Sequence, residues 1–358
     1  MTNLRPRSAS FTTASRDKGE DFIVKELRIG ILGATGAVGQ EMLRVLEEYG
    51  IPVSELRPLA SARSAGGTVY FRDREIKIQE AAEDSFKGLD YVLGAVKNGM
   101  SRAFAPAIVE SGAVYIDNSS AFRLDPDVPL VVPEINGEDA FTNKGIIANP
   151  NCSSTITLMA VAGLAKLSPI KSMVACTYQA VSGAGQKGFD ELEGQMRAVL
   201  AGEKTESSVF PTQIAMNVIP FIGEELENLY TDEEMKMQNE GRRILHLPAL
   251  KVSCTCVRVP VMRSHSISVT VRTERKISVE EARDAVRAYP GCRLVEDCQG
   301  RNYPTPLDTS NQDLVWVGRI REDLTDERGL TLWCCGDQIR KGAASNAVQI
   351  LRLMAERG

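Results

Sequence analysis

The chain has 358 residues, 43% hydrophobic and 25% charged, which is the composition of a soluble globular protein long enough for two domains. Its formal net charge of −5 argues against a nucleic-acid partner, because binding to phosphates requires a basic face. No apolar run approaches the roughly 20 residues that cross a bilayer, and no secretory signal is evident, so we expect a cytoplasmic protein without a membrane partner.

Residues 1–22 contain Arg5, Arg7 and Arg16, several Ser and Thr, and no acidic residue before Asp17. This composition predicts a flexible extension. Import into an organelle through this segment is the alternative, although the segment is short for a targeting peptide.

The chain from Glu26 onward begins with a strand, a glycine-rich turn and a helix: LRIGIL, GATGAVG and QEMLRVLEEY. Strands alternating with helices predict a Rossmann-like α/β domain with a doubly wound parallel sheet over residues 23–152. The further strands are predicted at 56–60, 91–96, 114–117 and 146–148, with a helix at 101–111.

Gly33, Gly36 and Gly39 stand at three-residue spacing between the first strand and the first helix. Glycine at these positions lets the pyrophosphate of a dinucleotide approach backbone N–H groups and the positive end of the helix. We therefore predict a dinucleotide site; a purely structural tight turn is the alternative.

The end of the second strand indicates which dinucleotide binds. An NAD site usually carries an acidic residue there for the ribose 2′-hydroxyl. This chain has Ser61, Arg63 and Ser64 instead, a guanidinium with two hydroxyls that suits a 2′-phosphate. We predict NADP as the cofactor; the alternative is that Arg63 is a solvated loop charge.

The motif NPNCSS places Cys152 where the last strand of the first domain gives way to a helix. Because the positive end of a helix lowers a thiol pKa, we predict a thiolate nucleophile beside the nicotinamide. Other cysteine spacings, such as Cys254 with Cys256 and Cys334 with Cys335, match no zinc pattern, so no metal is expected.

Beyond that cysteine, the apolar helix TITLMAVAGLAKL leads into the alternating strands SMVACTYQAV, KVSCTCVRV and HSISVTVRT, with helices at 186–201, 232–246 and 278–288. This pattern predicts an α+β domain over residues 153–338 whose sheet has one buried face. A final helix within residues 339–358 is expected to pack back on the first domain.

His265, in RVPVMRSHS, is one of only two histidines and is the natural base for Cys152. Arg258 lies seven positions earlier, at the end of a predicted strand. A charged substrate also requires cations, and Arg123, Lys236 and Arg258 are the candidates; each taken alone could equally be a surface charge.

A series of segments, in order from about Leu27 to Met354, resembles the aspartate-β-semialdehyde dehydrogenase family: GATGAVG, LASARSAG, DNSSAFR, NPNCSS, TYQAVSGAG, EEMKM, CVRVPVMRSHS and CGDQIRKGAASNAVQI. The resemblance implies the reversible, NADPH-dependent reduction of 4-phospho-L-aspartate to L-aspartate 4-semialdehyde and phosphate through a cysteine thioester. This step belongs to lysine, threonine, methionine and diaminopimelate biosynthesis. The resemblance also implies a homodimer.

The resemblance carries over residue roles as well. The catalytic residues would be Cys152, the nucleophile, His265, the acid/base, and Gln179, which orients the acyl intermediate. The substrate would be bound by Arg258 at its α-carboxylate, by Glu233 at its ammonium, and by Arg123 and Lys236 at its phosphate. The cofactor would be bound by Gly33, Thr35, Gly36, Ala37, Val38, Gly39, Ser61, Arg63, Ser64, Ser182, Gly183 and Gln338.

Two other functions compete with this one. N-acetyl-glutamyl-phosphate reductases share the chemistry but usually carry NPGCYPT around the cysteine, where this chain has NPNCSST. A non-catalytic NADP-binding sensor would keep the glycine loop, but it would have no reason to combine Cys152 with His265 and a set of anion-binding residues.

Overall fold

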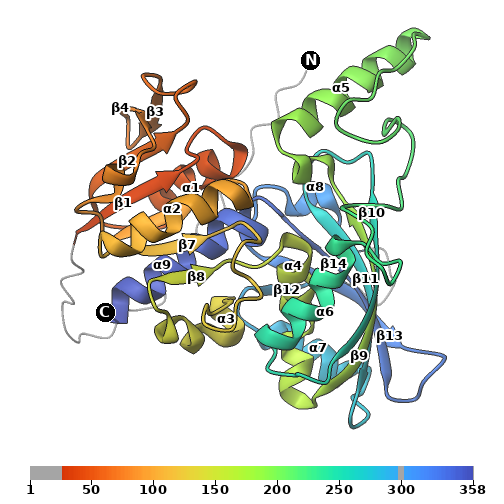
Figure 1. Ribbon diagram of the computed structural model, residues 1–358. Helices are drawn as coiled ribbons and strands as arrows, with labels where there is room; N and C mark the ends of the chain where they lie inside the picture. Colours follow the sequence, from red (N-terminus) through yellow and green to blue (C-terminus); the bar gives the residue numbers. More distant parts are fainter. Residues whose placement is uncertain (1–25, 297–301, 358) are drawn as a thin grey trace, which may run out of the picture.

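The structure is a computed structural model that describes residues 26–296 and 302–357. Two large sheets with their helices form the body of the molecule, and the C-terminal helix returns to the first sheet (Figure 1). The predicted extension at residues 1–22 lies outside the described residues. Within the described ranges, no helix is long and apolar enough to cross a membrane.

The first sheet has six parallel strands in the order β5-β2-β1-β6-β7-β8. The order reverses beside β1, which is the topological switch point of a doubly wound sheet. Nearly every residue of β1 is buried because helices cover both faces of such a sheet. The predicted Rossmann-like fold is confirmed. The elements are β1 (Leu27–Leu32), α1 (Ala37–Glu48), β2 (Val53–Ala60), β5 (Gln79–Glu80), η1 (Glu83–Phe86), β6 (Tyr91–Gly94), α2 (Asn98–Glu110), β7 (Val114–Asp117), α3 (Pro133–Asn136), η2 (Gly137–Thr142) and β8 (Ile146–Ala148).

A small hairpin that the sequence pattern did not predict follows β2. It pairs β3 (Thr68–Phe71) with β4 (Arg74–Lys77). The connecting residues Arg72 and Asp73 both have positive φ, 49° and 59°, as a two-residue hairpin turn of this hand requires. Arg-Asp is not the usual glycine-containing turn pair, so these two residues carry no clear turn signal.

The second sheet is mixed, in the order β10-β9-β11-β14-β13-β12. Its four central strands are antiparallel, and the edge strands β10 and β12 run parallel to their neighbours. Helices α4, α6 and α7 cover one face around a large apolar core, as predicted. The elements are α4 (Cys152–Leu167), β9 (Ile170–Gln179), η3 (Val181–Ala184), α5 (Gln186–Ala201), α6 (Asp232–Ile244), β10 (Lys251–Arg258), β11 (His265–Thr273), α7 (Val279–Ala288), β12 (Cys292–Leu294), α8 (Pro306–Thr309), β13 (Val315–Glu322) and β14 (Gly329–Gly336).

The C-terminal segment passes from β14 through a π-helix, η4 (Arg340–Ala344), into α9 (Ser345–Arg357). Val348 and Leu351 of α9 lie in the same apolar core as Ile29 of β1 and Met42 of α1. The last residues of the chain thus complete the core of the first sheet, and Figure 1 shows α9 lying beside β7 and β8.

Two consecutive cations of η4 are fixed by ionic contacts. Arg340 bonds to Glu41 and Glu48 of α1 and to Asp313. The Lys341 side chain is completely buried, and its Nζ lies 2.5 Å from Glu134 Oε2. Because these partners lie on different elements, η4 is held from several sides.

Candidate active site

The glycine loop between β1 and α1 has the shape of a ligand cradle. Gly33 has a φ of 92°, and a Cβ there would lie 2.5 Å from the Ala95 carbonyl oxygen, while a Cβ at Gly39 would lie 2.3 Å from the Gly33 carbonyl oxygen. Only glycine lets strand, turn and helix approach this closely. A Cβ at Gly36 would meet nothing nearer than 3.5 Å, and Thr35 and Gly36 are exposed, so this side of the loop is open to a ligand.

The helix that follows this loop supplies the other part of an anion site. Gly36 is the N-cap of α1 and has no side chain that could cap it. The first backbone N–H groups of the helix, at Ala37 and Val38, are therefore available to an anion at the positive end of the helix dipole. The loop also lies at the switch point of the sheet, so the residues present fit the pyrophosphate of a dinucleotide.

The turn that holds Ser61, Arg63 and Ser64 begins where β2 ends, next to the glycine loop. The Gly33 N–H donates a 2.8 Å hydrogen bond to the carbonyl oxygen of Leu59, near the end of β2. Arg63 is exposed, and in the described part of the chain its guanidinium has no hydrogen bond or ion pair. Its charge is therefore available to a ligand.

Cys152 is the first residue of α4, and its position is fixed by the cap of that helix. The side-chain oxygen of Asn151 accepts the N–H groups of Ser153, at 2.9 Å, and Ser154, at 3.2 Å. All residues of α4 from Ser153 to Leu164 are buried, so the cysteine sits on a rigid support. Its Sγ lies 3.4 Å from Nε2 of His265, the first residue of β11. The two residues predicted to react together are thus brought together.

The acidities of this pair differ from the sequence-based prediction. Burial raises the pKa of the Cys152 thiol to about 12, and Glu233 adds to the rise, while Arg123 and Arg258 oppose it. The prediction that the helix end lowers this pKa is wrong for the ligand-free protein, because desolvation of the sulfur outweighs the dipole. Burial, with a further effect of Arg258, lowers the pKa of His265 to about 3. At neutral pH a neutral thiol faces a neutral imidazole.

Glu233 and Lys236 stand near the start of α6. A capping box between Thr231 and Glu234 begins this helix. Lys236 Nζ lies 3.0 Å from Glu233 Oε2, and Gln179 donates a 3.1 Å hydrogen bond to the other oxygen of Glu233. Although burial opposes ionisation, Lys236 and the hydrogen-bond donors lower the pKa of Glu233 to about 2, so it is a carboxylate.

Arg258, at the end of β10, points into the same region. Its Nη1 donates to the Ala180 carbonyl oxygen at 2.7 Å, and its guanidinium lies 5.8 Å from the centre of the Phe210 ring. A Cβ at Gly183 would lie 2.8 Å from Arg258 Nη1 and 3.7 Å from His265 Cε1. The glycine therefore leaves room for both side chains.

Arg123 is buried and has more partners than a surface cation. Its Nε donates to Asn149 O and its Nη2 to Asn118 O, both at 2.9 Å, and its Nη1 donates to Glu240 Oε1 at 3.2 Å. The other oxygen of Glu240 accepts the backbone N–H of Asn151 at 2.8 Å. Arg123 and Glu240 thus connect α6 to the residue that caps α4.

Sequence reasoning missed Glu240. Its position in α6 could have indicated its role. Glu240 lies on the same helix face as Met237 and Ile244, which are both buried. Glu233 belongs to this face as well. An acidic residue on a buried helix face implies an ionic partner, although the sequence does not say which one.

Ser182 and Gln338, which were predicted to contact the cofactor, bond to each other through their side chains. Gln338 also accepts the backbone N–H of Ser264 at 2.8 Å. Ser264 directly precedes His265, so this trio lies next to the imidazole. Among the described residues, no group of three or more His, Cys, Asp or Glu side chains could hold a metal ion.

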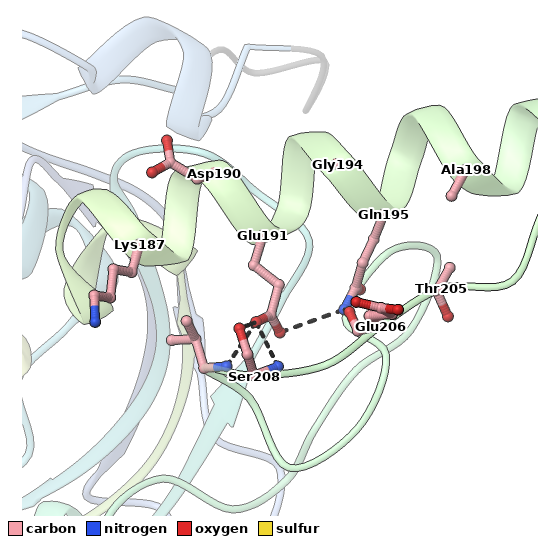
Figure 2. A pocket seen from close by; sticks show the side chains of 10 residues that line it. Lys187, Asp190, Glu191, Gly194, Gln195, Ala198, Thr205, Glu206 and Ser208 are labelled. Atoms are coloured by element: carbon pink, nitrogen blue, oxygen red, sulfur yellow. Dashed lines mark hydrogen bonds between the residues drawn. The ribbon is translucent and has the colours of Figure 1, made fainter.

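A surface cavity of about 450 Å³ lies between α5 and the loop that follows it, and none of its lining residues belongs to the cysteine site. Figure 2 shows how Glu191 fastens this loop: its carboxylate accepts the N–H groups of Ser208 at 2.8 Å and Val209 at 2.6 Å. The next residue, Phe210, lies against Arg258. Glu191 therefore supports the active site indirectly.

Two protein-family models match this chain. Residues 28–142 match the family described as semialdehyde dehydrogenase, NAD binding domain, and residues 161–341 match the semialdehyde dehydrogenase dimerisation domain. Together with the dinucleotide loop and the cysteine–histidine pair, these matches define a two-domain semialdehyde dehydrogenase.

Close relatives make the assignment specific. The aspartate-semialdehyde dehydrogenase of Synechocystis sp. is 47% identical over 332 residues, 93% of this chain and 98% of that protein. The enzyme of Aquifex aeolicus is 47% identical over 335 residues, 92% of this chain and 98% of that protein. The crystal structure of aspartate semialdehyde dehydrogenase II from Vibrio cholerae has a TM-score of 0.91 at 42% identity, covering 93% of this chain and 99% of that one. The chain belongs to the aspartate-semialdehyde dehydrogenase family, and it is an oxidoreductase of amino-acid biosynthesis.

Proposed function

We propose that this chain catalyses the reversible, NADPH-dependent reduction of 4-phospho-L-aspartate to L-aspartate 4-semialdehyde and phosphate. The observation that carries the proposal is the 3.4 Å approach of Cys152 Sγ to His265 Nε2 at the carboxyl edge of a dinucleotide-binding sheet. A crystal structure of the Vibrio cholerae enzyme, 41% identical to this chain, is described as complexed with ASA, which supports the choice of substrate.

Cys152 would attack the acyl carbon and expel phosphate, leaving a thioester. The bound nicotinamide would supply the hydride that reduces this thioester. His265 would serve as the acid/base for the sulfur and the acyl oxygen. Gln179, held by Glu233, would orient the acyl group. A sulfur fixed at a helix start on a buried helix needs little reorganisation to reach the acyl carbon.

The charged groups around the sulfur suit an amino-acid phosphate. We propose that Arg258 binds the α-carboxylate and that Glu233 binds the ammonium. Arg123 uses three of its N–H donors within the protein, and a guanidinium has five, so donors remain for a phosphate oxygen. Lys236 would leave its present partners, Asp232 and Glu233, to complete the phosphate site.

NADP is the proposed cofactor. The open glycine loop and the start of α1 would hold the pyrophosphate, and Ser61, Arg63 and Ser64 would bind the 2′-phosphate. Ser182, Gly183 and Gln338 would face the nicotinamide. We propose the following domains. Residues 23–152 bind the dinucleotide, and residues 153–338 carry the substrate site and the subunit contact. Residues 339–358 pack on the first domain.

We also propose that the protein is a homodimer in the cytoplasm. The outer face of the second sheet exposes Val174 and Tyr178 beside the half-buried Trp333, and a second copy would cover these side chains. The cysteines in the described part of the chain are all free thiols, in keeping with a reducing compartment.

Cys152→Ser should abolish turnover while NADPH affinity changes by no more than a few-fold, because the serine hydroxyl cannot replace the sulfur nucleophile. Steady-state rates and NADPH fluorescence titration measure the two quantities. Cys176→Ser, which removes another partly buried thiol, is the matched control and should stay active. Retained turnover in Cys152→Ser would contradict the thioester mechanism.

The substrate is tested by following phosphate-dependent reduction of NADP. Aspartate semialdehyde should support the reaction, and N-acetyl-glutamate semialdehyde should not. The reverse preference would assign the chain to the N-acetyl-glutamyl-phosphate reductase activity.

A further inference from the structure

A single buried carboxylate joins two parts of the active site. The Glu240 side chain on α6 is only 1% exposed. Its Oε1 accepts a hydrogen bond from the Arg123 guanidinium at 3.2 Å, and its Oε2 accepts the backbone N–H of Asn151 at 2.8 Å. Asn151 directly precedes Cys152. The same carboxylate therefore holds the arginine proposed for the phosphate and the peptide that leads into the nucleophile.

Helix α6 also holds Arg123 by its backbone. Arg243 follows Glu240 by three positions, so the two side chains are neighbours on the helix surface. The Arg243 guanidinium donates to the carbonyl oxygen of Arg123 and, at 2.8 Å, to that of Val128. The loop that carries Arg123 is thus fixed to α6 at both its side chain and its backbone.

The sulfur has supports of its own that do not involve Glu240. The side-chain oxygen of Asn151 caps α4, and its Nδ2 donates to Glu233 at 3.1 Å. Helix α4 is itself buried along most of its length. Loss of the Glu240 contact should therefore leave Cys152 in place, whereas Arg123 would lose a carboxylate partner.

Stability alone is a poor explanation for this carboxylate. A buried ion pair contributes little net stability, because removing two charges from water offsets their mutual attraction. Two directional contacts on separate loops do what an apolar pair could not: they set the spacing between Arg123 and the start of α4. Reacting atoms must approach to about 3 to 3.5 Å, so a fixed spacing favours the reaction of phosphate at the sulfur-bound acyl group.

We propose that Glu240 is a positioning residue that holds Arg123 and the peptide before Cys152 at one spacing, so that phosphate reaches the acyl carbon on the sulfur. The inference rests on the proposed function and adds a residue to its phosphate step. Glu240 acts through Arg123 rather than on the substrate. Its negative charge by itself opposes phosphate, so the benefit comes from its position.

The step that depends on this spacing is acyl transfer between sulfur and phosphate. In the direction of NADP reduction, hydride transfer first leaves the aspartyl group on Cys152 as a thioester. A phosphate oxygen then forms a bond to the acyl carbon, the carbon–sulfur bond breaks, and its electron pair returns to the sulfur. The phosphate proton passes by way of His265 to the sulfur and restores the thiol. Only this second stage uses the phosphate site.

Glu240→Asp tests the spacing at constant charge. Its side chain is one carbon–carbon bond shorter, about 1.5 Å, so it cannot reach both Arg123 and Asn151. With aspartate semialdehyde and NADP but without phosphate, the variant should still give a stoichiometric burst of NADPH, because this stage needs no phosphate site. With phosphate present, kcat/KM for phosphate should fall by at least about ten-fold, as expected when a hydrogen bond to a charged group is lost.

Glu296→Asp is the matched control. The Glu296 carboxylate likewise accepts one arginine, Arg283, and one backbone N–H, that of Ile320 at 3.0 Å, and its side chain is 11% exposed. These contacts join α7 to β13, and neither element carries a predicted site residue. The control should keep both the burst and the use of phosphate. A loss of phosphate use equal to that of Glu240→Asp would overturn the proposal.

The burst and the phosphate kinetics decide the proposal together. Unchanged phosphate kinetics in Glu240→Asp would overturn it. Loss of the burst would overturn it as well, because Glu240 would then support the fold as a whole rather than the phosphate site.

Binding of inorganic phosphate to the resting protein, titrated by ³¹P NMR, separates this inference from the proposed function because it needs no turnover. Glu240→Asp should bind phosphate at least about ten-fold more weakly than the wild type. Equal affinities would overturn the positioning role. A wild type that binds phosphate but does not turn over aspartate semialdehyde would contradict the proposed function alone.

Discussion

The buried imidazole of His265 links the active site to the pH dependence of stability. Its pKa in the fold is lowered to about 3, from an ordinary value of 6.5. Below pH 6.5 the unfolded chain therefore binds a proton that the folded chain does not bind until about pH 3. The neutral imidazole therefore does not lower the unfolding free energy above pH 6.5. As the pH falls below 6.5, the unfolding free energy decreases by up to about 1.4 kcal/mol per pH unit, because protonation favours the unfolded chain.

We therefore expect the unfolding free energy of the wild type to fall between pH 7.5 and 5.5 by about 1 kcal/mol more than that of His265→Gln, which lacks the titrating ring. Urea unfolding curves at the two pH values provide the measurement. Parallel losses in both proteins would show that the imidazole is not held neutral.

The exposed guanidinium of Arg63 should distinguish the two dinucleotides. Arg63→Ala should weaken NADPH binding by about ten-fold or more, the loss of a charge-assisted pair with the 2′-phosphate, and leave NADH binding unchanged. Arg74→Ala removes another exposed arginine of the same domain and is the control. Equal losses for the two cofactors in Arg63→Ala would show that this side chain does not read the 2′-phosphate.

Most residues of the site could be predicted from the sequence, but their pKa values could not. The sequence placed Cys152 and His265 together because their motifs are distinctive. It could not give the thiol pKa, since the helix dipole is a local property whereas burial depends on elements far away in the chain. For the same reason Glu240 was missed: its partner Arg123 lies 117 positions away.

The π-helix η4 packs directly against the backbone of the nucleophile, Cys152. A Cβ at Gly342 would lie 2.7 Å from the Cβ of Cys152 and 3.1 Å from its Cα. Arg340, in the same element, is bonded to α1. Because Arg340 and Lys341 fix η4 through ionic contacts with other elements, we expect the cysteine, rather than η4, to move when a methyl group is added.

Gly342→Ala should lower kcat by about ten-fold or more, since displacement of a reacting atom by less than an ångström is costly in rate. Alkylation of Cys152 by iodoacetamide should change in parallel. The control is Gly163→Ala, on the same helix as the cysteine, where a Cβ would lie 3.0 Å from the Ala285 carbonyl oxygen. If the control loses as much kcat as Gly342→Ala, the effect is one of general packing.

Elements with a clear period were predicted well, and the irregular ones were not. The boundaries of α5 and β8 agree with the prediction because their apolar spacing and flanking glycines are explicit. The strands of the hairpin β3–β4 have only four residues each and the π-helix η4 has five, so neither element is long enough to give a clear pattern. Their shapes follow from contacts that form only in the folded chain, such as the buried ion pair of Lys341.

The subunit contact that we propose lies on the outer face of the second sheet. Val174 is 62% exposed on β9, and the Tyr178 and Trp333 rings lie 5.4 Å apart on the same sheet. An apolar face on central antiparallel strands is stable in water when a second copy covers it.

Val174→Glu should convert the proposed dimer to a monomer, because it would place two carboxylates in an apolar contact. Analytical ultracentrifugation measures the change. Leu324→Glu, at a residue that is 99% exposed beyond β13, is the control and should remain dimeric. A Val174→Glu protein that sediments like the wild type would place the contact elsewhere.

The return of α9 to the first sheet has a consequence for biosynthesis of the chain itself. The core around Ile29 and Met42 lacks Val348 and Leu351 until the whole second sheet has been synthesised, because α9 follows that sheet in the chain. A nascent chain of this protein therefore cannot complete the core of its nucleotide-binding half first, although domains usually fold in the order of their synthesis. We expect the first sheet to gain its full stability only after the second sheet has emerged from the ribosome.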